Sequence, residues 1–137
     1  MSVPNGLLDI PGAIELHDWF GYWPTFHGDE VIHLHLNRTG TSSMLVQITR
    51  WTDEVDERGY YKFDKRGLVE FLPEDVTELD LENFNHQNVI FSISMERTPS
   101  GYRFDMDTSF GLMGTIDVKR FSISLAPAEL PDKPLSI

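Results

Sequence analysis

The 137-residue chain contains no cysteine. This absence excludes a disulfide scaffold and any thiolate-based metal or redox site. Basic residues are scarce: 11 Lys and Arg stand against 22 Asp and Glu, giving a formal net charge of −11 at pH 7. Nucleic acids and anionic membranes are bound through basic surfaces, so we expect neither as a partner. The charge favours a basic partner, or it serves solubility alone.

Long hydrophobic runs are also missing. No stretch approaches the roughly 20 apolar residues that span a bilayer. The first residues, Met-Ser-Val-Pro-Asn, have neither the basic nor the apolar region of a secretory signal. We therefore expect a cytoplasmic location. The length predicts a single domain over residues 1–137, with residues 1–7 and 127–137 as loosely attached termini.

No motif for catalysis is present. The sequence has no phosphate-binding glycine-rich loop, and no serine or cysteine motif for a nucleophile. Asp105 and Asp107 would share one face of a strand, but we interpret that face as solvated. We expect neither an enzyme nor a cofactor.

Apolar and polar residues alternate with period two over most of the chain after residue 30, which predicts half-buried strands. We expect strands over 31–36, 44–49, 68–72, 77–82, 89–96, 102–107 and 115–125. Pro73 would end the third strand. Val89, Phe91, Ile93 and Met95 would share one face of the fifth, and the last strand changes phase near Lys119 and Arg120.

A short helix is expected before the strands. Asp9 would cap it, Pro11 fits its first turn, and Gly21 would end it. The fold class is therefore α+β and mainly antiparallel β, with about seven strands and one N-terminal helix. The pattern leaves a sandwich and a partly open barrel as equal alternatives.

Residues 19–27 form an aromatic segment that contains two of the three tryptophans, Trp19 and Trp23. Such large rings usually belong to a core, where they would clamp the helix onto the sheet. The alternative is that they line a ligand pocket. We favour the core.

His33 and His35 would lie on one face of a strand, because side chains alternate. Two imidazoles can begin a zinc site, for which His27, Asp29 and Glu30 are near enough to supply further ligands. Spacing of two residues is weak evidence, so we expect no metal. A small-ligand or metal-binding β-barrel remains the alternative function.

An acidic run follows a tryptophan between two expected strands. It consists of Trp51, Asp53, Glu54, Asp56 and Glu57. Like charges in a loop are usually only solvated, but a surface that binds a basic protein would also contain such a cluster of acidic residues. Tryptophan is a frequent anchor in interfaces, so these residues are our candidate partner-binding group. A second acidic stretch over residues 70–82 is better explained as the wet face of a strand.

Two segments are more specific than these patterns. Residues 19–31 read Trp-Phe-Gly-Tyr-Trp-Pro-Thr-Phe-His-Gly-Asp-Glu-Val, and residues 81–90 read Leu-Glu-Asn-Phe-Asn-His-Gln-Asn-Val-Ile. Both resemble motifs of the immunity protein 50 family, and the resemblance extends over roughly residues 8–125. The matching positions are Trp19, Tyr22, Trp23, Pro24, Phe26, His27, Phe84, Asn85, Gln87 and Asn88.

This resemblance implies a small cytoplasmic protein of a bacterial polymorphic-toxin system that binds and neutralises a cognate toxin. It implies a binding inhibitor and not an enzyme. Many toxin nuclease domains are basic because they bind phosphates, and an acidic protein would fit such a cleft. The matching residues are interpreted as determinants of the fold.

Overall fold

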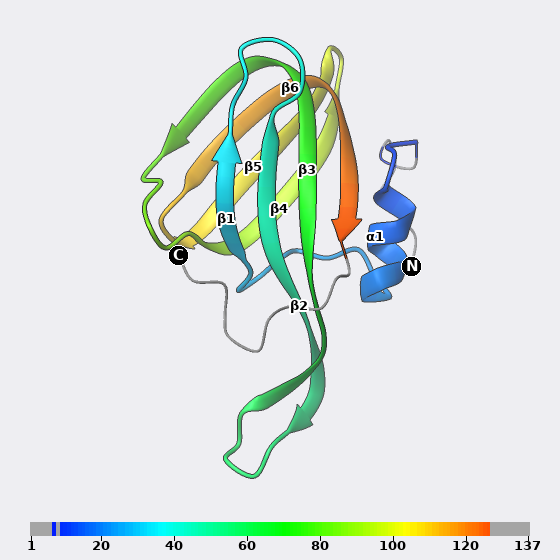
Figure 1. Ribbon diagram of the computed structural model, residues 1–137, viewed down its shortest axis with the longest axis vertical. Helices are drawn as coiled ribbons and strands as arrows, with labels where there is room; N and C mark the ends of the chain where they lie inside the picture. The colour runs from blue at the N-terminus through cyan, green and yellow to red at the C-terminus, as the bar shows by residue number, and fades with distance from the viewer. Residues whose placement is uncertain (1–6, 8, 127–137) are drawn as a thin grey trace.

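The computed structural model describes residue 7 and residues 9–126, which form one short helix and six strands (Figure 1). The elements are α1 Ala13–Phe20, β1 Glu30–His35, β2 Ser43–Val55, β3 Tyr61–Glu82, β4 Val89–Thr98, β5 Gly101–Phe110 and β6 Met113–Ala126. The expected termini 1–6 and 127–137 lie outside the described residues. Leu7, which we also assigned to a loose terminus, is instead buried in the core.

The six strands form one antiparallel ring in the order β1-β2-β3-β6-β5-β4. The expected class, mainly antiparallel β with one N-terminal helix, is confirmed. There are six strands because residues 61–82 form a single strand that passes through Pro73. The Pro73 carbonyl accepts a hydrogen bond from Ser42 N–H at 2.8 Å. Its nitrogen therefore faces the same side, where β2 is only beginning, and the missing N–H disturbs the ladder little.

The ring closes unevenly between β1 and β4, where Glu30 and Val89 form the one register pair. The chain just before β1 completes this seam. Gly28 N–H donates to Ile90 O at 2.8 Å, and Ile93 N–H donates to Thr25 O at 2.9 Å. The fold is thus a barrel that closes unevenly, and the aromatic segment covers part of the β4 edge.

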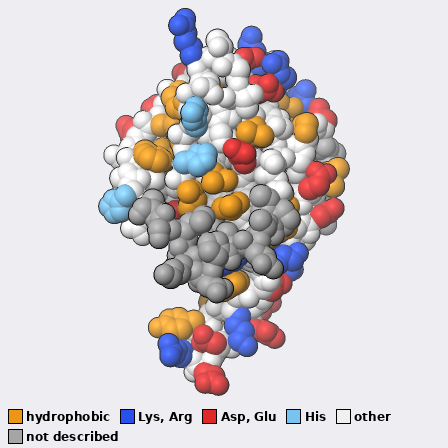
Figure 2. All heavy atoms as spheres, in the orientation of Figure 1, with side chains coloured by type: hydrophobic (Ala, Val, Ile, Leu, Met, Phe, Trp, Pro, Cys, Tyr) orange, Lys and Arg blue, Asp and Glu red, His pale blue; other side chains and the backbone are white. Residues whose placement is uncertain are grey.

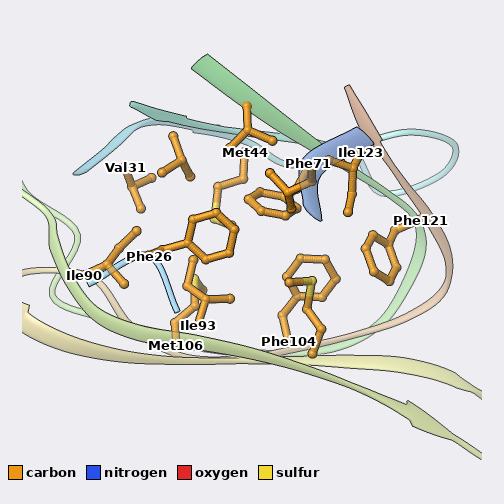
Figure 3. Close-up of a cluster of buried hydrophobic side chains, with 14 of the residues drawn as sticks. Phe26, Val31, Met44, Phe71, Ile90, Ile93, Phe104, Met106, Phe121 and Ile123 are labelled. Carbon is orange, nitrogen blue, oxygen red and sulfur yellow. The ribbon is translucent and has the colours of Figure 1, made fainter. Parts of the chain in front are cut away.

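Aromatic rings fill the interior of the barrel. Phe71 lies 5.5 Å from Phe26 and 5.6 Å from Phe104, and Phe104 lies 4.6 Å from Phe121, all with edge-to-face geometry. Figure 3 shows these rings pointing toward one another from opposite walls. Burial of such rings is a large part of the hydrophobic stabilisation of a small domain.

The expected inward face of β4 is partly wrong. Ile93 and Met95 are buried as expected, but Phe91 is 50% exposed and Ile90 is buried instead. The β4–β5 register shifts between Val89 and Ile90 and again between Ile90 and Ser92. Each irregularity interrupts the strict alternation on which the expectation rested.

The expected phase change in the last strand is present. Val118 and Phe121 are both buried, and exposed Lys119 and Arg120 lie between them. Ile116 and Val118 before this break, and Phe121 and Ile123 after it, are therefore all buried.

Helix α1 lies beside the end of β6 (Figure 1), where Ile123 N–H donates to Pro11 O at 2.7 Å. Gly12 precedes the helix with φ 90°, and a Cβ there would lie 1.8 Å from Ile123 O. Only glycine fits this approach. Gly12, and not Asp9 as expected, is thus the N-cap, while Gly21 ends the helix as expected, with φ 83°. The helices of the described chain include none that is long and apolar enough to cross a bilayer.

Candidate functional site

Strands β2 and β3 extend beyond the barrel as a twisted two-stranded ribbon (Figure 1). We call residues 51–66 the arm. Asp56 organises its turn, because its carboxylate accepts hydrogen bonds from Arg58 N–H at 2.9 Å and Tyr60 N–H at 3.0 Å. The arm contributes no residue to the buried core. It is therefore an element that the barrel does not need for its own packing.

All five candidate partner-binding residues lie on the arm, and all are exposed: Trp51, Asp53, Glu54, Asp56 and Glu57. Four basic residues share the arm with them and with Asp64: Arg58, Lys62, Lys65 and Arg66. Five acids and four bases leave the arm with a net charge of only −1. Figure 2 shows hydrophobic, basic and acidic side chains together at its far end. The surface is mixed, and the acidic run alone does not describe it.

The arm also exposes large apolar side chains. Tyr60 and Tyr61 are 67% and 66% exposed at the turn, and Val55, Phe63 and Trp51 are about half exposed. A projecting ribbon with this many exposed rings in so few residues is typical of an interaction surface.

Trp51 lies at the root of the arm. Its ring contacts Phe63 edge-to-face with centroids 6.0 Å apart, and the Arg66 guanidinium lies 4.1 Å from the Phe63 ring. Trp51 is 51% exposed, and it also forms one wall of a cleft. It therefore joins the arm to the neighbouring aromatic segment.

This root cleft has a volume of about 340 Å³. It is lined by Phe20, Tyr22, Trp23, Pro24, Thr25, Phe26, His27, Asp29, Thr49 and Trp51. The structure thus brings together the aromatic segment and the candidate anchor Trp51, which are far apart in sequence. No sequence pattern connected the two groups.

The aromatic segment serves the core and the cleft at once. Phe20, Pro24 and Phe26 are buried, whereas Tyr22 and His27 are exposed. Phe26 has φ 66°, a conformation that bulky residues rarely adopt. Our preference for the core therefore describes only part of the segment.

Trp19 and His27 each fix the segment to another strand. Lys65 Nζ donates to Trp19 O at 2.9 Å and lies 5.4 Å from the centre of the Trp19 ring. His27 Nδ1 is 3.0 Å from Phe91 O, and the two rings are 5.2 Å apart. These contacts hold the segment against β3 and β4.

Asp29 lies at the junction of the root cleft and a second cleft of about 220 Å³, which Gly28, Glu30, Gln47, Thr49 and Arg66 also line. The residue is only 4% exposed. Thr49 N–H donates to Oδ1 at 3.1 Å. Burial raises the pKa of the Asp29 carboxyl from 3.8 to about 7, although the Thr49 hydrogen bond opposes the shift.

We considered Asp29 only as a further metal ligand. Parity did not predict its burial, because it places Asp29 and Val31 on the same face as His33 and His35, which are exposed. The register shift between Val31 and His33 breaks this alternation, and Asp29 and Val31 are both buried.

The second motif organises a turn before β4. Asn88 is 3% exposed; its Oδ1 accepts hydrogen bonds from Asn85 N–H at 3.1 Å and Leu112 N–H at 3.0 Å, and its Nδ2 donates to Asn85 O at 2.7 Å. Asn85 Oδ1 in turn accepts from Gln87 N–H at 2.9 Å. Phe84 and Gln87 are exposed. The two asparagines thus satisfy backbone donors that the turn would otherwise leave unpaired.

His33 and His35 are both exposed on β1. Among residues 7 and 9–126, no three His, Asp or Glu side chains are grouped so that they could hold a metal ion. The described part of the chain therefore offers these two histidines no further ligands.

The second acidic stretch divides into two parts. Glu74 and Asp75 lie 3.8 Å and 2.9 Å from the Arg120 guanidinium. Glu78, Asp80 and Glu82 are exposed along β3. Much of the net negative charge is therefore on the barrel, away from the arm.

Comparison with known proteins places the chain in a family. A family model described as Immunity protein 50 matches residues 12–124, which include both motifs. No curated protein and no solved structure matches the chain. The matched region extends from the start of α1 into β6 and so covers the barrel, the arm and the root cleft. The chain belongs to the Immunity protein 50 family.

Proposed function

We propose that this immunity protein binds a cognate bacterial toxin directly and neutralises it, using the arm and the root cleft as the contact surface. Family membership supports a toxin as the partner. The protein acts as a stoichiometric inhibitor in the cytoplasm and not as an enzyme, and it needs no nucleic acid, membrane or cofactor.

The observation that carries the proposal is the exposed aromatic arm. An isolated two-stranded ribbon is at best marginally stable in water. Exposed rings on such a ribbon are better explained by a partner that covers them than by the needs of the fold. Trp51 would be the central anchor, because its ring connects the arm to the cleft.

We further propose that the toxin is basic. The formal charge of −11 attracts a basic domain from a distance, while the mixed charges of the arm would set the orientation on contact. Asp53, Glu54, Asp56 and Glu57 would meet basic groups of the toxin. Arg58 and Lys62 would restrict which basic surfaces fit.

The test is binding to the toxin domain encoded by the neighbouring gene, measured by co-purification at low and high salt and by titration calorimetry. The Trp51→Ala variant should bind at least about tenfold more weakly, as expected for an interface anchor. Leu79→Ala is the matched control, since Leu79 is 43% exposed at the far end of β3. Absence of a complex at both salt concentrations would contradict the proposal.

A further inference from the structure

We propose that the root cleft receives an arginine side chain of the toxin, with the Asp29 carboxylate as its acceptor. This inference rests on the proposed function and names the group that the cleft recognises. It follows from the Asp29 carboxylate, which has no counter-ion, from the aromatic residues that line the root cleft, and from the volume of that cleft.

One of the two carboxylate oxygens of Asp29 has no partner among the described residues. Thr49 N–H binds Oδ1, and among the described residues Oδ2 has no hydrogen-bond or ion-pair partner. No fully buried polar side-chain atom of the described chain lacks a partner. Oδ2 must therefore retain access to solvent, and the two clefts that Asp29 lines provide that access.

Nearby cations are already engaged. Arg50 pairs with Asp64 at 2.8 Å, and the Arg66 guanidinium lies on the Phe63 ring. Neither forms an ion pair with Asp29. A buried carboxylate without a counter-ion is unfavourable, and a cation brought by a partner would remove that penalty.

The walls fit a guanidinium better than a metal or an ammonium. Tyr22, Trp23 and Trp51 line the cleft, and a planar guanidinium can stack on aromatic rings. The same group can donate two hydrogen bonds to one carboxylate. A volume of about 340 Å³ is at the lower end for a binding pocket, which suits one long side chain.

The first experiment needs no toxin. N-acetyl-arginine amide is titrated into the protein at pH 8, above the pKa of Asp29, while NMR follows the three indole N–H resonances. Trp23 and Trp51 line the cleft and should shift, whereas Trp19 does not line it and is the internal control. N-acetyl-citrulline amide, the neutral analogue, should produce no saturable shift.

Asp29→Asn is the matched variant, because it retains the shape and the oxygen that accepts Thr49 N–H. It should weaken the response to the arginine probe at least tenfold. An equal response from the variant, an equal response to citrulline, or no shift of Trp23 and Trp51 would overturn the inference.

The second experiment uses the toxin complex. Asp29→Asn should weaken toxin binding at least tenfold, and Asp9→Asn, at an exposed carboxylate that lies 3.5 Å from Arg97, should not. A complex that forms equally well with Asp29→Asn would refute the arginine site and leave the proposed function standing. Failure of the unmodified protein to bind the toxin would refute the proposed function itself.

Discussion

At the scale of single residues, Asp29 shows how the fold maintains an unfavourable group. Its carboxylate is almost completely removed from water and receives one backbone hydrogen bond. A structural role alone would be served as well by asparagine, which accepts the same bond without a charge. A residue that lowers the stability of a protein is often retained because it has a function. Asp29 is such a residue, and it lies between two clefts.

The raised pKa of Asp29 predicts a pH dependence of stability. The pKa is about 7 in the folded state against 3.8 ordinarily, so the folded state binds more protons between these values. The free energy of unfolding therefore falls as pH rises through this window, by at most about 4 kcal/mol for this group. Asp29→Asn should thus be more stable than the unmodified protein at pH 8, and the difference should shrink toward pH 4.

Denaturant unfolding of both proteins across pH 4–8.5 measures this difference. The titratable groups that line the two clefts together with Asp29 are His27 on the aromatic segment, Glu30 on β1 and Arg66 on β3. All three are common to both proteins, so their contributions largely cancel at each pH. The raised pKa of Asp29 would be contradicted if the difference in free energy of unfolding did not vary with pH, or if the asparagine variant were the less stable protein at pH 8.

Substitutions of two phenylalanines, one buried and one exposed, test which side chains belong to the core. Phe104 is 1% exposed and packs between Phe71 and Phe121, so Phe104→Ala should destabilise the protein by about 3–5 kcal/mol. Phe91 is 50% exposed, and Phe91→Ala should destabilise it by less than about 1.5 kcal/mol. Denaturant unfolding measures both, and equal effects would show that the inward face of β4 is misassigned.

At the scale of elements, the strand pattern was largely readable from the sequence. Alternation identified the regions of all six strands, and Gly21 marked the end of the helix. Two predictions failed because another feature determined the local geometry. Phe91 was expected to point inward, but bulges in β4 turn it outward. Pro73 was expected to end a strand, but β3 continues through it at a point where β2 has barely begun. The arm was not predicted at all, because its residues are exposed on both sides and show no alternation.

The candidate site was predictable only in parts. Trp51 and the aromatic segment each stood out by composition, but their meeting in one cleft depends on how β2 passes the chain before β1. Asp29 lies within the first motif, but nothing in that motif predicted its burial. Tertiary contacts of this kind cannot be derived from periodicity.

The arm should be separable from the fold. Replacing residues 52–62 with Asn-Gly would join the paired residues Trp51 and Phe63 through a two-residue turn. The free energy of unfolding should change by less than about 1 kcal/mol, because the buried core lies outside the arm. Toxin binding, measured by calorimetry, should weaken at least tenfold. A variant that fails to fold, or that binds unchanged, would contradict our view of the arm.

At the scale of the whole molecule, the residues that carry most of the net charge lie outside the proposed contact surface. The net charge of −11 lies mostly outside the arm, as exposed Glu78, Asp80 and Glu82 illustrate. Charges remote from an interface act mainly on the association rate. In the proposed complex, the barrel would therefore contribute long-range attraction, and the arm and the root cleft would contribute the contacts.

This division predicts the effect of salt on toxin binding. The association rate should fall about tenfold or more between low salt and roughly 0.5 M NaCl, with a smaller change in the dissociation rate. A Glu78→Gln, Asp80→Asn variant should associate more slowly and dissociate at the same rate in stopped-flow measurements. A changed dissociation rate would place these residues in the interface and contradict the division.

The most direct test of the central claim is amide hydrogen exchange of the protein alone and in complex with its toxin. Our account predicts that binding protects the arm, residues 51–66, and the cleft-lining residues 20–29, while strand β5 and the part of β4 beyond Ile93 exchange unchanged. Protection confined to β4 and β5, or unchanged exchange of the arm in a formed complex, would contradict the claim that the arm and the root cleft bind the toxin.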